Sequence, residues 1–221
     1  MWYIHICNIY VFKVIKRKIE VVKVIYGFFG SIPSCPHQRG KQALRGNGKT
    51  LSMTVLAYQS YLSEDKDAIS NYQTEFSRTV PTEEIGELII AEDIRDSVIM
   101  ITEMQLYLNS LGVNTKRLHK FIGEVVAQSR KRDVDIFYDS QRYTDIHPRL
   151  RVQTDRAFLP RKFHLDDTPC SLDRCKKEHI IKLYQHDPFE RNPIIILRAD
   201  IADQLYDSNE IVICKKEGAK S

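Results

Sequence analysis

The residues from Arg45 to Thr50, R-G-N-G-K-T, could bind the phosphate groups of a nucleotide. A glycine-rich turn followed by lysine and threonine is typical of a phosphate-binding loop, in which backbone amides and the start of the next helix surround phosphate oxygens. Lys49 would reach the β- and γ-phosphates of ATP, and the hydroxyl of Thr50 would hold Mg²⁺. The alternative is a chance G-N-G-K-T in an ordinary loop, but apolar runs suited to a strand and a helix flank these residues.

The full motif requires a glycine five residues before Gly48, where this chain has Ala43. Joining Ser31 directly to Arg45 restores a complete Walker A sequence, G-S-R-G-N-G-K-T, and makes residues 32–44 an insertion. The insertion could loop into solvent, because closing a longer loop costs little additional entropy. It could also be absent from the working protein, as a translated in-frame intron would be, and we favour this explanation because its two prolines have no amide hydrogen to donate. The expected nucleotide-binding residues are Gly30, Ser31, Arg45, Gly46, Asn47, Gly48, Lys49, Thr50 and Leu51.

The apolar run Val98–Ile101, followed by Thr102 and Glu103, is a second candidate element. Ligands of an open α/β sheet bind at the C-terminal ends of its strands. A Walker B strand normally ends in Asp-Glu, where the aspartate orients a water on Mg²⁺ and the glutamate activates the attacking water. Thr102 replaces the aspartate. A threonine can form a hydrogen bond with a metal-bound water but has no charge, so we expect a lower affinity for Mg²⁺. Glu103 occupies the position of the catalytic base.

Gln141 follows the strand-like sequence I-F-Y-D-S and could sense the γ-phosphate from the end of that strand. Basic residues stand on both sides of it in the chain. An arginine from a neighbouring subunit can stabilise the charge that develops in phosphoryl transfer, and arginines also contact the DNA backbone. A solvated basic face explains each of them equally well. The candidates are Arg130, Arg149 and Arg151.

Cys170, Cys175 and His179 form a C-x4-C-x3-H pattern, with His164 and His186 close in sequence. They could bind zinc, although the spacing is not a standard one. A local disulfide and ordinary thiols are the alternatives, and ordinary thiols are the simplest. The odd total of five scattered cysteines argues against a secreted disulfide scaffold.

Strand-like and helix-like segments alternate along the chain, which predicts an α/β fold with a mostly parallel sheet. The chain from residue 143 to the region before residue 179 is expected to be irregular and basic. Strands are expected at 21–29, 68–76, 96–104, 134–140, 179–184 and 193–197, and helices at 51–63, 81–90, 115–129 and, as a short turn, 201–206.

The totals fit one globular domain: 221 residues, of which 43% are hydrophobic and 28% charged. A net charge of +4 is compatible with a nucleic acid partner. No apolar run is long enough for a stable membrane span. Residues 1–20 are expected to be an N-terminal extension, either an extra strand or the product of an early start codon rather than a membrane or partner anchor. The main domain is expected at 21–212 and a tail at 213–221.

Several segments together resemble the FtsK–HerA superfamily of P-loop ATPases, over about Val21 to Val212. They are GFFGS…RGNGKTLSMT, SNYQTEF, VIMITEM, SRKRDVDIFYDSQRYTDIHPRLR and LYDSNEIV. Genome-packaging ATPases of archaeal and other tailless DNA viruses are the most similar branch, with zonula occludens toxin-like phage assembly proteins as cousins.

The resemblance implies a RecA-like P-loop core that binds ATP and Mg²⁺ and forms a homo-oligomeric ring, often a hexamer. It implies ATP-driven translocation of double-stranded DNA, contact with capsid vertex proteins, and a location in the host cytoplasm or on the virion. It assigns nucleotide and Mg²⁺ binding to Lys49 and Thr50, the catalytic base to Glu103 and the sensor to Gln141. Asp207 and Asn209 match a segment that lies near the nucleotide.

Two other functions remain open at this point. A nucleotide-binding assembly protein with little hydrolysis is favoured by the insertion and by Thr102. A HerA-like ATPase that processes plasmid or chromosomal DNA with a nuclease would share all of the motifs.

Overall fold

A computed structural model describes most of the expected domain: residues 25–32, 47–91, 94–108, 126–170, 175, 177–186, 193, 195–198 and 205. Several expectations therefore fall outside the described residues. These are the extension 1–20, residues 33–46 with Arg45 and Gly46, the first part of the helix at 115–129, the turn at 201–206 except for Leu205, the pair Asp207 and Asn209, and the tail 213–221.

The described strands form one eight-stranded sheet in the order β3-β2-β4-β5-β1-β6-β7-β8. The pairs from β3 to β6 are parallel, whereas β6–β7 and β7–β8 are antiparallel. The mostly parallel α/β sheet predicted from the sequence is thus confirmed. The strands are β1 (Ile25–Ser31), β2 (Asp67–Ser70), β3 (Arg78–Thr79), β4 (Ser97–Ile101), β5 (Val134–Arg142), β6 (Arg156–His164), β7 (His179–Gln185) and β8 (Ile195–Arg198).

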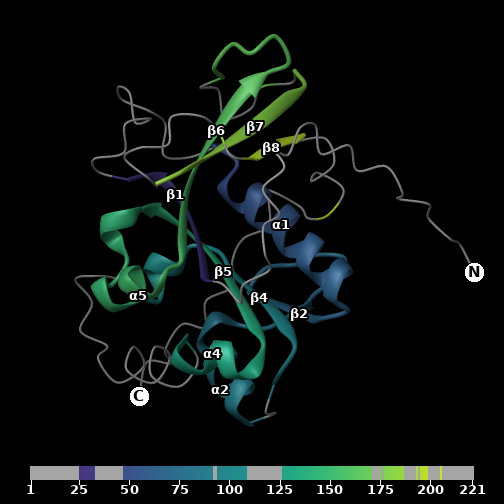
Figure 1. Ribbon diagram of the computed structural model, residues 1–221, viewed down its shortest axis with the longest axis vertical. Helices are drawn as coiled ribbons and strands as arrows, with labels where there is room; N and C mark the ends of the chain where they lie inside the picture. The colour runs from purple at the N-terminus through teal and green to yellow at the C-terminus, as the bar shows by residue number, and fades with distance from the viewer. Residues whose placement is uncertain are drawn as a thin grey trace, which may run out of the picture.

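Helices cover both faces of this sheet (Figure 1). Helix α1 packs through Met53 and Val55 on the face that contains Phe28 and Phe137. Ile85 of α2 and Leu150 of α5 belong to the cluster on the other face. The helical elements are α1 (Lys49–Glu64), α2 (Thr82–Ala91), η1 (Met104–Leu106), α4 (Ala127–Arg132), η3 (Tyr143–Asp145) and α5 (Pro148–Gln153).

The central strands are apolar throughout because both of their faces are covered. All five residues of β4 are buried, and successive residues join the two clusters in turn: Val98 and Met100 one, Ile99 and Ile101 the other. This is the pattern of a parallel strand between two helical layers. The same alternation in β5 fixes which of its side chains point toward α1, and Asp139 is two residues beyond Phe137 on that face.

Three expected elements differ from the structure. Strand β2 ends at Ser70, and the side chain of the next residue, Asn71, bonds to the backbone of Thr102. Strand β4 ends at Ile101, before Thr102 and Glu103. The region after residue 143 is not irregular: it contains α5 and the nine-residue strand β6. In the described part of the chain, no helix is long and apolar enough to cross a membrane.

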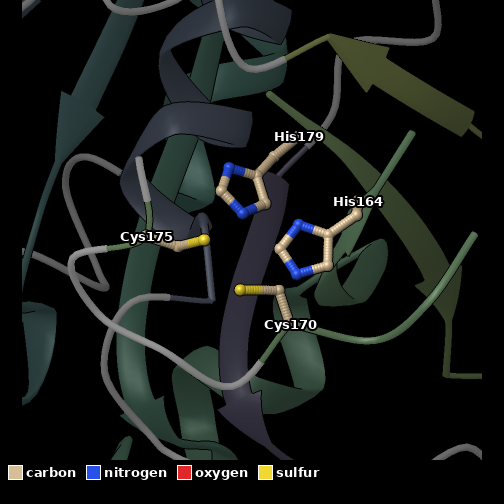
Figure 2. Close-up of side chains that lie close together, drawn as sticks. All are labelled: His164, Cys170, Cys175 and His179. Atoms are coloured by element: carbon tan, nitrogen blue, oxygen red, sulfur yellow. The ribbon is translucent and has the colours of Figure 1, made fainter. Parts of the chain in front are cut away.

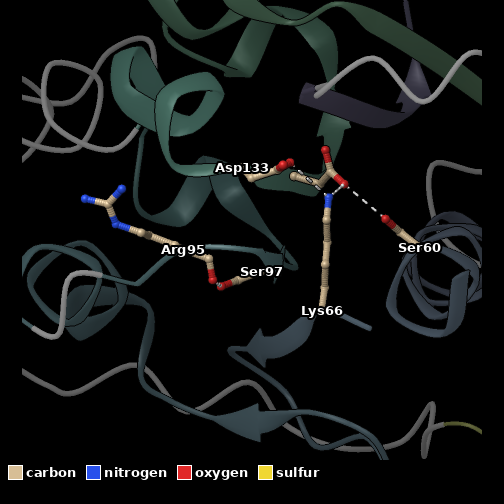
Figure 3. A network of polar contacts seen from close by, with 6 residues as sticks. Ser60, Lys66, Arg95, Ser97 and Asp133 are labelled. Carbon is tan, nitrogen blue, oxygen red and sulfur yellow. Dashed lines mark hydrogen bonds and ion pairs between the residues drawn. The ribbon is translucent and has the colours of Figure 1, made fainter. Parts of the chain in front are cut away.

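A buried ion pair lies at the end of the sheet where strand β5 begins (Figure 3). Lys66 Nζ donates to Asp135 Oδ2 over 2.6 Å and lies 3.5 Å from Asp133 Oδ1. Ser60 Oγ of α1 donates to the same Asp135 oxygen over 3.0 Å. Lys66 and Asp135 are both buried, so the pair ties the end of α1 and the start of β2 to β5.

Candidate nucleotide-binding site

The end of β1 and the start of α1 form the described part of the candidate phosphate loop. Gly30 and Ser31 end β1, and α1 begins at Lys49 directly after Gly48. The first turn of a helix has free backbone amides that can bind an anion. Ile32, the first residue of the expected insertion, is fully buried in the core, and the rest of that segment lies outside the described residues.

Gly48 is required at the start of α1 for two reasons. Its φ is +78°, in the left-handed region that favours glycine. A Cβ atom there would also overlap the side chain of Ile181, so β7 packs directly on this turn. Leu51, expected near the nucleotide, has its side chain in the core cluster under α1, which leaves its backbone to face the loop.

Lys49, Gln141 and Glu103 form a hydrogen-bonded chain across the C-terminal edge of the sheet. Lys49 Nζ donates to Gln141 Oε1 over 3.4 Å, and Gln141 Nε2 donates to Glu103 Oε1 over 2.8 Å. Gln105 also donates to Glu103, through its other carboxylate oxygen. The expected sensor therefore links the expected phosphate-binding lysine to the expected base, although the three residues come from separate stretches of the sequence.

Asp139 is the residue at this site that the sequence analysis missed. Its Oδ2 accepts hydrogen bonds from Thr50 Oγ1 over 2.6 Å and from Thr102 Oγ1 over 3.0 Å. Its Oδ1 accepts from the backbone amide of Glu103 over 2.9 Å. Asp139 thus supplies, from β5, the carboxylate that Thr102 lacks at the end of β4. The available signal was its position two residues before Gln141, on the same face of a buried strand.

Burial dominates the electrostatics of Asp139. The side chain is fully buried, and this desolvation raises its pKa above the ordinary value of 3.8. Lys49 and the hydrogen bonds from Thr50 and Glu103 oppose the rise. A carboxylate kept away from water between two hydroxyl groups favours a bound cation as its partner.

The turn that carries Glu103 is held in an uncommon conformation. Glu103 has φ +53°, and the other described non-glycine residues with positive φ are all aspartates, which tolerate it better. Asn71 fixes the turn by bonding Thr102 on both sides: its Nδ2 donates to the carbonyl over 3.0 Å, and its Oδ1 accepts from the amide over 2.8 Å. Asn71 is therefore a positioning residue that the sequence reading placed in a strand.

Among the expected arginines, Arg149 and Arg151 have no hydrogen bond or ion pair with Lys49, Gln141 or Glu103 in the described residues. Arg149 is exposed on α5, where its backbone amide donates to His147 Nδ1. Arg151 lies over the ring of Tyr143, 5.3 Å from its centre. Arg130 is in α4, and its side chain is outside the described residues.

The residues present fit Mg²⁺, which prefers oxygen ligands. Asp139, Thr50 and Thr102 bring a carboxylate and two hydroxyl oxygens together at the start of α1, with Thr50 Oγ1 3.4 Å from Thr102 Oγ1. Thr50 and Thr102, the expected metal-binding residues, thus both donate hydrogen bonds to the carboxylate of Asp139.

The strand order places β5, with Asp139 and Gln141, between the phosphate-loop strand β1 and the Glu103 strand β4. With the loop between β1 and α1, this order defines the fold. It is the mostly parallel, RecA-like arrangement that the sequence predicts. No protein-family model matches the sequence, and neither does any curated protein.

Solved structures similar to this P-loop fold have low sequence identity to it. The N-terminal domain of zonular occludens toxin from Neisseria meningitidis has a TM-score of 0.49 and 13% identity, covering 87% of this chain and 95% of that chain. The genome packaging NTPase B204 from Sulfolobus turreted icosahedral virus 2, in complex with ATP-γ-S, has a TM-score of 0.43 and 13% identity, covering 77% and 100%. The flagellar accessory protein FlaH from Methanocaldococcus jannaschii has 0.39 and 9%, covering 80% and 89%.

Proposed function

We propose that this chain is an ATPase that moves double-stranded DNA, and that it packages a viral genome into a capsid. The observation that carries the ATPase proposal is the hydrogen-bonded chain from Lys49 through Gln141 to Glu103, beside the buried Asp139. Hydrolysis needs a base near the γ-phosphate, and Glu103 is the carboxylate that this chain links to Lys49 through Gln141.

In the proposed reaction, Lys49 and the amides at the start of α1 bind the β- and γ-phosphates. Glu103 accepts a proton from a water molecule, whose oxygen attacks the γ-phosphorus. The bond from the γ-phosphorus to the bridging oxygen breaks, and ADP and inorganic phosphate form. Mg²⁺, held by Asp139 and Thr50 when bound, would neutralise charge on the phosphate oxygens.

Gln141 has a specific place in this proposal. Its side chain joins Lys49 to Glu103. Phosphate oxygens attract the Lys49 ammonium more strongly than a neutral amide does, because ammonium and phosphate carry opposite charges. Nucleotide binding would then release Gln141 from Lys49 and change its hold on Glu103, which couples the nucleotide state to the position of the base.

The DNA part of the proposal rests on the resemblance of the motifs to packaging ATPases and on the mildly basic chain. The name of B204, a genome packaging NTPase, fits the same proposal. Translocation along DNA by a ring would use the exposed Arg149 or neighbouring basic side chains against phosphates. Contact with capsid vertex proteins, and the host cytoplasm or virion as the location, belong to this proposal as well.

The test is the rate of phosphate release from ATP, with and without linear double-stranded DNA. We expect Mg²⁺-dependent hydrolysis that DNA stimulates, and a loss on the order of 10²-fold in Lys49→Ala. Exposed Lys131→Ala on α4 is the matched control and should retain the rate. Nucleotide binding without hydrolysis in the wild type would instead support the assembly protein with little hydrolysis. Hydrolysis that DNA does not affect would contradict translocation.

The same assay on a chain lacking residues 32–44 tests the insertion. If only the shortened chain hydrolyses ATP, the insertion is not part of the working enzyme. If only the full chain is active, the burial of Ile32 has a structural role and the intron explanation is wrong. Association of the protein with capsids rather than with a nuclease would separate packaging from the HerA-like alternative.

A further inference from the structure

Four potential metal ligands meet where β6 and β7 are joined. His164 is the last residue of β6 and His179 the first of β7, and the two are partners in the antiparallel register. Cys170 and Cys175 come from the connecting segment. One ligand atom from each of the four lies within 4.8 Å of every other, and Figure 2 shows both sulfur atoms and both rings turned toward a common centre. From this geometry we propose that these residues bind a zinc ion.

The donor set selects the metal. Two thiolates and two imidazoles are the ligands of tetrahedral structural zinc sites, and hard cations such as Mg²⁺ prefer oxygen. Zinc bonds of about 2.0–2.3 Å place neighbouring ligand atoms roughly 3.3–3.8 Å apart. The observed separations, up to 4.8 Å, need only a small inward shift to reach that range.

The backbone brings these side chains together independently of any metal. Beyond β6 the chain reverses in a short turn, in which the His164 amide donates to the Thr168 carbonyl over 2.9 Å. The Cys170 amide then donates back to the Lys162 carbonyl over 2.9 Å. These bonds fix Cys170 beside His164, whereas ladder pairing fixes His179 there, with the imidazole centres 4.9 Å apart.

The described contacts leave the cluster able to take up a metal. Neither Cys170 nor Cys175 is in a disulfide, and Cys170 is buried. His164 Nδ1 is buried and has no hydrogen-bond partner among the described residues. An imidazole nitrogen in that position is costly unless something binds it, and a coordinated metal removes the cost.

Four protein ligands fill a tetrahedral shell, so the site is structural rather than catalytic. The metal would close the β6–β7 connection and fix the start of β7. Ile181, two residues after His179 and on the same face, packs against Gly48 at the start of α1. The zinc would therefore stabilise the strand that supports the phosphate loop, a consequence that rests on the proposed nucleotide site.

The experiment measures metal in the full chain, purified under reducing conditions without chelator. We expect about one zinc per chain by elemental analysis. After zinc removal, Co²⁺ should give the intense visible absorption of a tetrahedral thiolate site and a sulfur-to-cobalt charge-transfer band. Cys170→Ser and Cys175→Ser should each lose the metal, whereas Cys175→His should keep it with a weaker charge-transfer band, because one thiolate remains.

Cys214→Ser and His186→Ala are the matched controls and should keep the metal. Folded wild-type protein that contains no zinc and gives no such Co²⁺ spectrum would overturn the proposal, as would a Cys170–Cys175 disulfide in protein alkylated at lysis. Equal metal content in the cluster variants and the controls would place the zinc elsewhere and also overturn it. The metal is measured without nucleotide, so a chain that holds zinc but binds no ATP would support this site and contradict the proposed function.

Discussion

At the scale of single residues, Glu103 allows the sharpest separation of chemistry from structure. Glutamine in its place keeps an oxygen that can accept from Gln141, but it cannot take a proton from water. For Glu103→Gln we expect kcat to fall on the order of 10²–10⁴-fold, the usual contribution of a general base. ATP affinity should change little. Steady-state kinetics and equilibrium binding of a labelled nucleotide would measure the two quantities.

The matched control for this substitution is Glu87→Gln, which removes an exposed carboxylate from α2. It should leave both kcat and affinity unchanged. An active Glu103→Gln protein would show that another group accepts the proton, and would remove Glu103 from the proposed mechanism.

Asp139 predicts a pH dependence of stability in the nucleotide-free protein. Because burial raises its pKa in the folded state above 3.8, the folded protein holds this proton more tightly than the unfolded chain does. The contribution to stability is present at low pH and is lost as the pH rises through the raised pKa. The side chain introduced by Asp139→Asn has no such proton to lose, and its amide can still take part in hydrogen bonds with Thr50 and Thr102.

We therefore expect Asp139→Asn to become more stable relative to the wild type as the pH rises from about 4, until the difference levels off. Urea unfolding at a series of pH values, with EDTA present, would measure it. The same variant should lose the stabilisation that Mg²⁺ and nucleotide give the wild type. A stability difference that does not vary with pH would contradict the assigned effect of burial.

At the scale of elements, the pair Lys66–Asp135 stabilises the end of the sheet where β2 and β5 begin, opposite the nucleotide site. Removing one member of a buried ion pair leaves the other charge uncompensated, at a cost of about 3–5 kcal/mol. Lys66→Met should lower the free energy of unfolding by that amount, because Ser60 alone cannot neutralise Asp135. Urea denaturation followed by circular dichroism would measure the loss.

The double variant Lys66→Met/Asp135→Leu tests the cause. It removes both charges, and it should recover most of the stability, since apolar replacement of a buried pair is often neutral. Lys131→Met, on the exposed side of α4, should change stability by no more than about 0.5 kcal/mol. A double variant as unstable as Lys66→Met would show that packing, not charge, explains the loss.

The sequence predicted the type of those elements that have a clear pattern of apolar residues or a clear turn motif. The buried strands β1, β4, β5 and β7 are apolar or regularly alternating, and α1 follows a glycine-lysine-threonine turn, so their type could be predicted. Strand β6 was missed because arginine, lysine and Pro160 interrupt it. Its pairing with β1 stops at Phe158, so the proline removes no hydrogen bond from that ladder.

The residues of the candidate site could be proposed from the sequence only where a motif marks them. Lys49, Thr50, Glu103 and Gln141 each stand at the end of a recognisable strand or at the start of a helix. Asp139 and Asn71 have no such motif. The role of Asp139 depends on the register between β4 and β5. The role of Asn71 depends on the conformation of the turn at Thr102, which residue propensities do not predict. The cysteine and histidine cluster was suspected from spacing, but its convergence depends on the pairing of His164 with His179.

At the scale of the whole molecule, the remaining proposal is that active sites are completed by a neighbouring subunit of a ring. Lys49 and Glu103 are joined within one chain, because Gln141 forms hydrogen bonds with both. Arg149 is exposed on α5 and outside that set, which is the placement expected of an arginine that acts on the next subunit. Variants of Lys49 or Glu103 and variants of Arg149 should therefore affect ATPase activity differently when two variants are mixed in one ring.

Lys49→Ala and Arg149→Ala should each be inactive alone, and mixing them under conditions of subunit exchange should restore activity. In an equal mixture about one interface in four combines an intact Lys49 with an intact neighbouring arginine, so roughly a quarter of the wild-type rate is expected. A mixture of Lys49→Ala with Glu103→Gln should stay inactive, because both residues are needed within the same chain.

The same mixing with Arg151→Ala or Arg130→Ala decides among the three arginines. If Arg149→Ala is inactive and is not rescued, Arg149 acts within its own subunit. If none of the arginine variants loses activity, the site is complete in a single chain, and the ring would then serve only to hold DNA.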